Sequence, residues 1–120
     1  MRKEIEIWLQ QALDDFEGAE YNFDGKKFSI AAFLCQQAIE KALKALLIQR
    51  TKAFPKIHDL THLARSLDAP EKIVTLCAQL NTAYVASRYP DTPKKFTSRE
   101  VMVLLTACKE VLEWAKKNLS

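Results

Sequence analysis

One uninterrupted stretch, residues 28–50, most strongly constrains how this 120-residue chain can fold. It reads FSIAAFLCQQAIEKALKALLIQR and contains neither proline nor glycine. Its larger apolar residues recur at a spacing that stacks them on one face of a helix. These residues are Phe28, Ala32, Cys35, Ile39, Leu43 and Leu46. Alanines run beside this stripe and allow other helices to approach closely, so we predict a central helix with neighbours on more than one side.

The rest of that helix carries polar side chains. They are Gln36, Gln37, Glu40, Lys41 and Lys44. Their grouping on one side predicts an ordinary solvated face. Glu40 and Lys44 are four residues apart, which places them for an ion pair along the helix.

Two more helices are predicted around this stretch. Apolar residues at helical spacing predict the first over residues 2–22. Pro55 then breaks the pattern after the central helix. A short third helix is expected within residues 58–67, with Asp59 or His58 near its N-cap.

The last two helices have clear start signals. The fourth is expected to open over residues 68–71, with a proline in its first turn, and to end near Arg88 because Pro90 follows. Thr97 and Glu100 match a capping box, which predicts a fifth helix to about residue 118. No stretch predicts a strand. We therefore expect an all-α fold, an antiparallel four-helix up-and-down bundle with one short additional helix, five helices in all.

Length and composition favour a single helical domain over residues 1–120. A chain of this size buries enough surface for a core without metal or disulfide staples. No run approaches the ~18 apolar residues of a membrane span. Acidic residues near the start stand where a signal peptide has its apolar segment, so we expect a cytoplasmic protein with no membrane association.

The three cysteines, Cys35, Cys77 and Cys108, lie far apart and form no C-x-x-C motif. Each falls on the apolar stripe of a different predicted helix. We expect buried, reduced thiols that act as small hydrophobic residues.

The charge is unevenly distributed along the chain. Residues 1–24 hold two basic and seven acidic side chains, and residues 25–99 hold thirteen basic and five acidic ones. The acidic first helix and the basic middle segment could attract each other within the fold. Alternatively, the basic segment presents a positive surface to phosphate or nucleic acid.

Two polar clusters at helix breaks are candidates for a site. His58, Asp59 and His62 include an i,i+4 histidine pair, a spacing that suits a metal ion, but no clear third ligand lies nearby beyond Asp59. We therefore predict no metal site and no cofactor.

The second cluster is Arg88, Tyr89 and Asp91. These residues suit phosphate binding and base stacking, or an Arg88–Asp91 ion pair that holds the loop.

Three segments stand out when they are taken together: FLCQQAIEKALKALL (33–47), HDLTHL (58–63) and SRYPD (87–91). They resemble the HEPN family, the "higher eukaryotes and prokaryotes nucleotide-binding" domains, and occur in the family's order and at family-like separations. The resemblance implies a five-helix bundle that forms homodimers. It also implies a minimal nucleotidyltransferase as partner in a toxin–antitoxin-like pair.

Many HEPN proteins are metal-independent ribonucleases with an R-x4-6-H motif, which this chain lacks. The nearest arrangement is Arg50 and His58, separated by seven residues. The leading hypothesis is therefore a non-catalytic module that binds a nucleotide or a nucleotidyltransferase. The residues expected to contact that ligand or partner are Arg88, Tyr89, Asp91, Lys41, Lys44 and Gln37.

Two alternatives remain. One is a ribonuclease toxin that acts on RNA with a degenerate site of His58, Asp59 and Arg88, in which histidine serves as the acid–base group near neutral pH. The other is a structural subunit whose SRYPD segment only locks a loop.

Overall fold

The structure is a computed structural model that describes residues 2–52, 56–88 and 95–119, with the side chains of residues 85–88 left aside. Within these ranges the chain forms five helices and no strand, which confirms the predicted fold class. The helices are α1 (Lys3–Asp24), α2 (Phe28–Thr51), α3 (Leu60–Ser66), α4 (Glu71–Arg88) and α5 (Ser98–Asn118). The predicted ends agree with these bounds to within a few residues.

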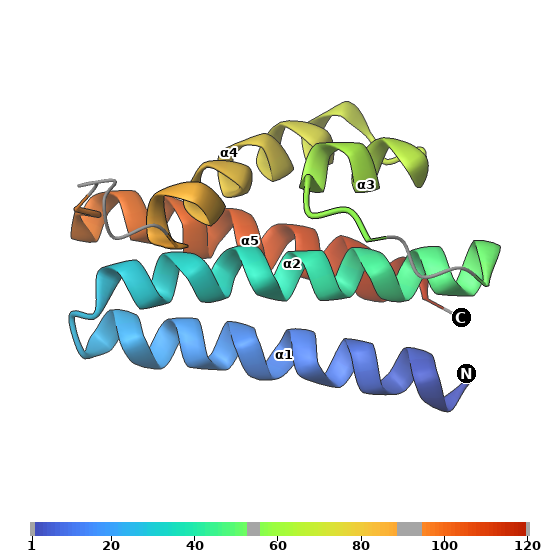
Figure 1. Ribbon diagram of the computed structural model, residues 1–120, viewed down its shortest axis with the longest axis horizontal. Coiled ribbons are helices and arrows are strands. Elements are labelled where there is room, and N and C mark those ends of the chain that lie inside the picture. The colour runs from blue at the N-terminus through green and yellow to red at the C-terminus, as the bar shows by residue number, and fades with distance from the viewer. Residues whose placement is uncertain (1, 53–55, 89–94, 120) are drawn as a thin grey trace.

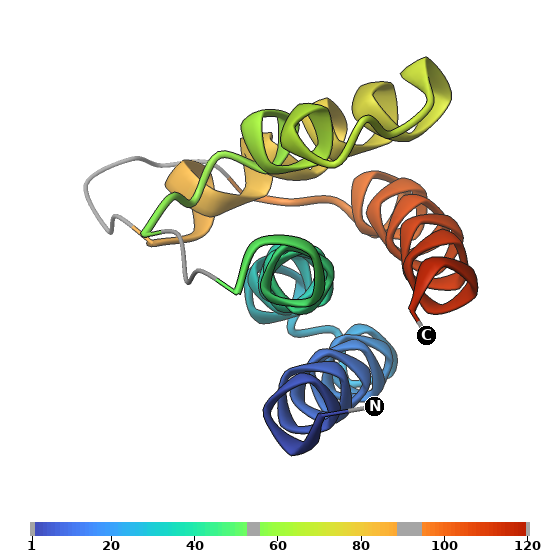
Figure 2. The same cartoon turned by 90° about the vertical axis from the view of Figure 1, so that its right-hand side faces the viewer.

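The long helices α1, α2, α4 and α5 alternate in direction, so that both chain ends lie at the same end of the bundle (Figure 1). Helix α2 packs against each of the other four helices. Figure 2 shows it in the middle, with α1 on one side, the α3–α4 layer on the opposite side and α5 beside them. The prediction of a central helix with several neighbours is confirmed.

The apolar stripe of α2 forms the centre of the core. Ile39, Leu43 and Leu46 are almost completely buried, together with the alanines beside them. Each large aliphatic side chain so buried contributes roughly 1.5–3 kcal/mol through loss of water contact. The three cysteines are buried and free, as predicted. Burial, reinforced by the charge of Asp59, raises the pKa of the Cys77 thiol to about 12.

The helix starts follow the expected local signals. Asp59, rather than His58, is the N-cap of α3, since its side chain accepts hydrogen bonds from the backbone N–H groups of the first turn. Thr97 and Glu100 form the predicted capping box at α5, with bonds of 2.9 and 3.1 Å. The break expected at Pro55 lies outside the described residues.

One prediction about α2 is wrong. The side expected to be solvated contains Gln36, Glu40 and Lys44, and all three are buried, with at most 6% of each residue exposed. The physical reason is that the α3–α4 layer and the segment leading into it lie over this side of α2. The amphipathic pattern of α2 indicates only which of its residues are polar. The packing of α3 and α4 against α2 decides which of those residues are exposed to water.

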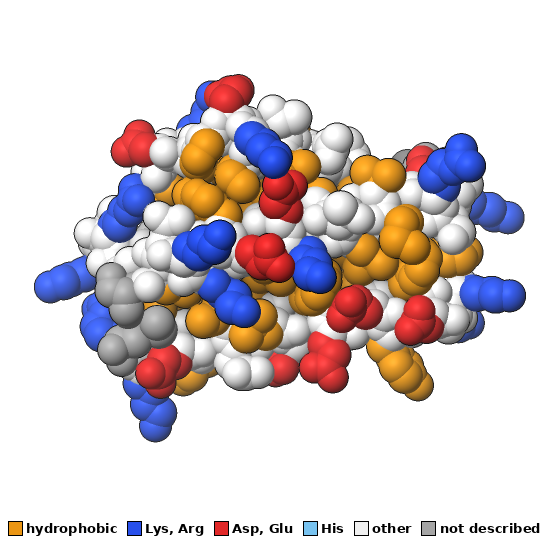
Figure 3. All heavy atoms as spheres, turned by 180° about the vertical axis from the view of Figure 1, so that it is seen from behind, with side chains coloured by type: hydrophobic (Ala, Val, Ile, Leu, Met, Phe, Trp, Pro, Cys, Tyr) orange, Lys and Arg blue, Asp and Glu red, His pale blue; other side chains and the backbone are white. Residues whose placement is uncertain are grey.

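The molecular surface mixes apolar and charged side chains. On the side opposite to the view of Figure 1, hydrophobic patches alternate with Lys, Arg, Asp and Glu side chains (Figure 3). Met102 and Val103 of α5 are each half-exposed. None of the described helices combines the length and the apolar character that a membrane crossing requires.

Candidate functional site

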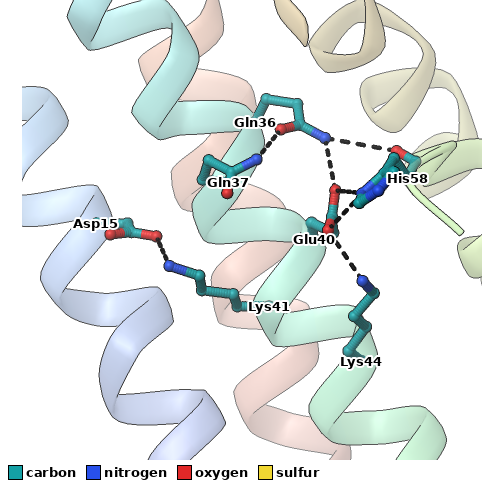
Figure 4. Close-up of polar contacts among 7 residues, drawn as sticks. All are labelled: Asp15, Gln36, Gln37, Glu40, Lys41, Lys44 and His58. Atoms are coloured by element: carbon teal, nitrogen blue, oxygen red, sulfur yellow. Dashed lines mark hydrogen bonds and ion pairs between the residues drawn. The ribbon is translucent and has the colours of Figure 1, made fainter. Parts of the chain in front are cut away.

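The site is built around Glu40, a carboxylate in the middle of α2. His58, which precedes α3, brings Nδ1 of its ring to 3.1 Å from Oε1 and 3.0 Å from Oε2 of Glu40 (Figure 4). The two residues are eighteen positions apart in the chain. The described segment that precedes α3 therefore places a histidine against a buried acidic group.

Two other side chains of α2 complete the surroundings of the carboxylate. Lys44 donates from Nζ to Oε2 of Glu40 at 3.0 Å, one helical turn away. Gln36 donates from Nε2 to Oε1 at 3.1 Å and, more weakly, to the backbone carbonyl of His58 at 3.4 Å. Among the described residues, no buried side-chain nitrogen or oxygen lacks a hydrogen-bond partner. The network is therefore fully satisfied, as buried polar groups require.

These contacts keep Glu40 ionised. Burial by itself raises the pKa of a carboxyl group because it disfavours the charged form. The hydrogen bonds from Lys44, Gln36 and His58, with the positive charge of Lys44, outweigh that effect and bring the pKa of Glu40 below its ordinary value. The site thus contains a fixed negative charge, balanced by one buried ammonium group.

His58 connects this interior network to the surface. Its side chain is 55% exposed although Nδ1 contacts a buried carboxylate. The imidazole stacks on the ring of Tyr84 in α4, with centroids 5.4 Å apart and planes 15° from parallel. The ring is therefore held at one edge by α2 and on one face by α4, which leaves it well oriented and open to solvent.

Of the second predicted cluster, the structure describes only the backbone of Arg88. Arg88 is the last residue of the helix, four positions beyond Tyr84, which is about one turn. The Arg88 side chain, Tyr89 and Asp91 lie outside the described part of the structure.

Asp59 has a different role from its neighbour His58. Its Oδ1 accepts hydrogen bonds from Nδ2 of Asn81 in α4 and from the hydroxyl and backbone N–H of Thr61. The bonds from Thr61 and Asn81 hold the pKa of Asp59 below its ordinary value. Asp59 thus joins α3 to α4 and fixes the segment in which His58 lies.

The other predicted contact residues fall on two sides of α2. Lys41 points toward α1, where Nζ donates to Oδ2 of Asp15 at 2.7 Å (Figure 4). Gln37 donates to Oε1 of Gln36 at 2.7 Å and so supports the network from outside. Of the predicted residues, the structure brings His58 and Lys44 into one network, while Lys41 is directed elsewhere.

Sequence reasoning missed Gln36, Glu40 and Tyr84 as members of the site. The apolar stripe and alanines of α2 predicted neighbours on more than one side, but its pattern carries no local sign that α3 and α4 cover the polar side. No group of three or more His, Cys, Asp or Glu residues suited to a metal ion occurs in the described ranges.

Comparisons with known proteins agree with this architecture. A family model described as the HEPN domain matches residues 5–119. The chain belongs to the HEPN family. Among solved structures, it is similar to TT1696 from Thermus thermophilus, with 26% sequence identity and a TM-score of 0.89 over 98% of this chain and 100% of that one.

A second similar solved structure is that of ST0689, described as an archaeal HEPN homologue. It shares 31% sequence identity with this chain, with a TM-score of 0.80 over 98% of each chain. None of the curated protein sequences matches the chain significantly. Of the segments that carry the HEPN resemblance, 33–47 and 58–63 meet directly, because Glu40 and Gln36 from the first contact His58 from the second.

Proposed function

We propose that this HEPN protein binds a nucleotide, without chemistry of its own, where α2, α3 and α4 meet. The observation that carries the proposal is the His58 ring, which is exposed to solvent, anchored to the buried Glu40 and stacked on Tyr84. Oriented aromatic rings at a surface are platforms on which bases stack, with little dependence on sequence. In this proposal a base extends the His58–Tyr84 stack.

The phosphate is assigned to Arg88. Lys41 and Lys44, expected from the sequence to neutralise phosphate, are already paired with Asp15 and Glu40, and Lys44 is also buried. Arg88 at the end of α4 keeps that role in the proposal, because a guanidinium group binds phosphate with two parallel hydrogen bonds. Tyr89 and Asp91 remain proposed members of the same site.

A titration with AMP and a short oligoadenylate RNA tests this proposal. Tyr84→Leu and Arg88→Ala should each weaken binding roughly tenfold, as expected for loss of one stacking or phosphate contact. Arg65→Ala is the matched control, because Arg65 is an exposed arginine whose Nη2 lies 3.7 Å from Oε1 of the exposed Glu71. If Tyr84→Leu and Arg88→Ala retain the wild-type affinity, the site is wrongly assigned.

The proposal also includes a protein partner. Membership of the HEPN family supports a cytoplasmic homodimer that pairs with a minimal nucleotidyltransferase as the non-catalytic component of a toxin–antitoxin-like system. Co-expression with a nucleotidyltransferase encoded beside this chain, followed by size-exclusion chromatography, should give a complex larger than the dimer. Separate elution of the two proteins would contradict the partnership.

A second candidate function is cleavage of RNA. It is favoured by the Glu40–His58 contact, since a histidine oriented by a carboxylate is the arrangement of many general bases. His58 would take the proton of a ribose 2′-hydroxyl whose oxygen attacks the adjacent phosphorus. A 2′,3′-cyclic phosphate then forms. The departing 5′-oxygen takes a proton from a general acid, which is either a protonated side chain or water.

Incubation of RNA with the folded protein and a chelator tests this candidate. Cleavage that disappears in His58→Ala, but persists in the control His62→Ala, would establish it. Intact RNA at high protein concentration would contradict RNA cleavage and leave nucleotide binding as the proposed function.

A further inference from the structure

The Glu40 carboxylate has donors at both of its oxygens. Gln36 donates to Oε1, Lys44 donates to Oε2, and Nδ1 of His58 lies within 3.1 Å of each oxygen. Gln36, Glu40 and Lys44 are buried, whereas His58 reaches the surface. The network therefore links an enclosed, charge-balanced interior to one exposed ring, and its geometry decides how that ring is presented.

The carboxylate determines which ring nitrogen of His58 carries the proton. An ionised carboxylate accepts hydrogen bonds and donates none. The ammonium group of Lys44, 3.0 Å away, favours that ionised form. Nδ1 must therefore be the protonated nitrogen in this contact. In a neutral imidazole only one nitrogen is protonated, so Nε2 is left with a free lone pair.

We infer that Glu40, held by Lys44 and Gln36, is a positioning residue that makes Nε2 of His58 the hydrogen-bond acceptor of the binding site. The inference rests on the proposed nucleotide-binding function and names the group that Nε2 recognises, a hydroxyl group of the nucleotide sugar. Phosphate oxygens only accept hydrogen bonds at neutral pH, so they do not complement a lone pair, whereas sugar hydroxyls donate. Within the described ranges, no residue hydrogen bonds to Nε2.

Nitrogen–proton correlation spectra of the imidazole rings test the positioning role directly. The chain contains two histidines, and the exposed His62 serves as an internal reference in the same spectrum. In spectra recorded at a pH where both imidazoles are neutral, the proton of His58 should lie on Nδ1, unlike that of His62. A His58 ring that is protonated on Nε2, or whose spectrum matches that of His62, would overturn the inference.

A pair of double variants keeps the test independent of unfolding. Glu40→Met/Lys44→Met removes both buried charges together and substitutes apolar side chains of similar length, a change that buried ion pairs often tolerate. In this variant His58 should lose its tautomer preference. The control Asp15→Met/Lys41→Met removes the ion pair on the other side of α2 and should leave the His58 spectrum unchanged.

Binding of AMP and of its 2′,3′-dideoxy analogue then tests the ligand class. Wild-type protein should bind AMP about tenfold more tightly, as expected for loss of one hydrogen bond, and Glu40→Met/Lys44→Met should bind both alike. Equal wild-type affinities would overturn the sugar hydroxyl as the recognised group while the proposed function stands. Binding of neither compound would overturn the proposed function and this ligand class together.

Discussion

Two lysine–carboxylate pairs, one on each side of α2, have the same chemistry in different surroundings. Lys41 and Asp15 lie 2.7 Å apart between α2 and α1, with 24% and 19% of their side chains exposed. Lys44 and Glu40 lie 3.0 Å apart under the α3–α4 layer, with 5% and 8% exposed. The Asp15 carboxylate contacts a lysine at a partly exposed position between two helices, whereas the Glu40 carboxylate also accepts hydrogen bonds from Gln36 and His58.

The difference indicates that the two pairs serve different purposes. A partly exposed pair is inexpensive to form and contributes modestly to stability. Burying two charges costs several kcal/mol per ion, which the attraction between them offsets only with good geometry and further hydrogen bonds. Apolar residues at positions 40 and 44 would serve the core at least as well. The Glu40–Lys44 pair is therefore better explained by its contact with His58 than by stability.

The largest effect is expected from separating the buried pair. Lys44→Met leaves Glu40 without its ammonium partner in the core and should lower the free energy of unfolding by about 3–5 kcal/mol. Urea denaturation at neutral pH, followed by circular dichroism, measures the change. Glu40→Met/Lys44→Met should recover most of this loss, because no charge then remains unpaired. A double variant as unstable as Lys44→Met would show that the pair itself is needed for folding.

The two pairs also show which features of the structure can be predicted from the sequence. Helix bounds were predictable because their signals are local, as with the capping box of Thr97 and Glu100 and the cap at Asp59. The i,i+4 pairing of Glu40 with Lys44 was predictable for the same reason. The burial of this pair was not predictable, because it depends on where α3 and α4 pack. The pattern of α2 itself does not encode either neighbour.

The candidate site was predictable only in part. His58 stood out as a titratable residue at a helix break, but its contacts with Glu40 and Tyr84 span 18 and 26 positions of the chain. Such contacts follow from the fold, not from spacing. Lys41 and Lys44, three positions apart on one helix, pointed to a shared surface, whereas the structure directs them to different neighbours.

A smaller effect should appear as acid sensitivity of the buried pair. The folded-state pKa of Glu40 lies below its ordinary value of 4.5, so its contribution to stability is fully present above that pH and is lost as pH falls through the folded pKa. In Glu40→Gln, the part of the acid-induced loss of stability that comes from protonation of Glu40 should be absent. Urea midpoints measured on both sides of pH 4.5 would show a shallower decline for the variant.

The matched control for acid sensitivity is Glu113→Gln, which alters an exposed carboxylate on α5. It should retain the wild-type decline. If Glu40→Gln declines as steeply as the wild type, the buried carboxylate does not gain its ionised form from the fold, and the tautomer argument for His58 loses its basis.

The smallest effect is expected on the α1 side, where Lys41→Met should cost about 1 kcal/mol or less. The remaining Asp15 carboxylate is part-exposed and can be hydrated, so no isolated charge is enclosed. A double-mutant cycle with Asp15→Asn, measured by urea denaturation, gives the coupling between the two residues. A coupling as large as that of Glu40 with Lys44 would remove the contrast between the two sides of α2, and with it the reason to assign the buried pair to His58.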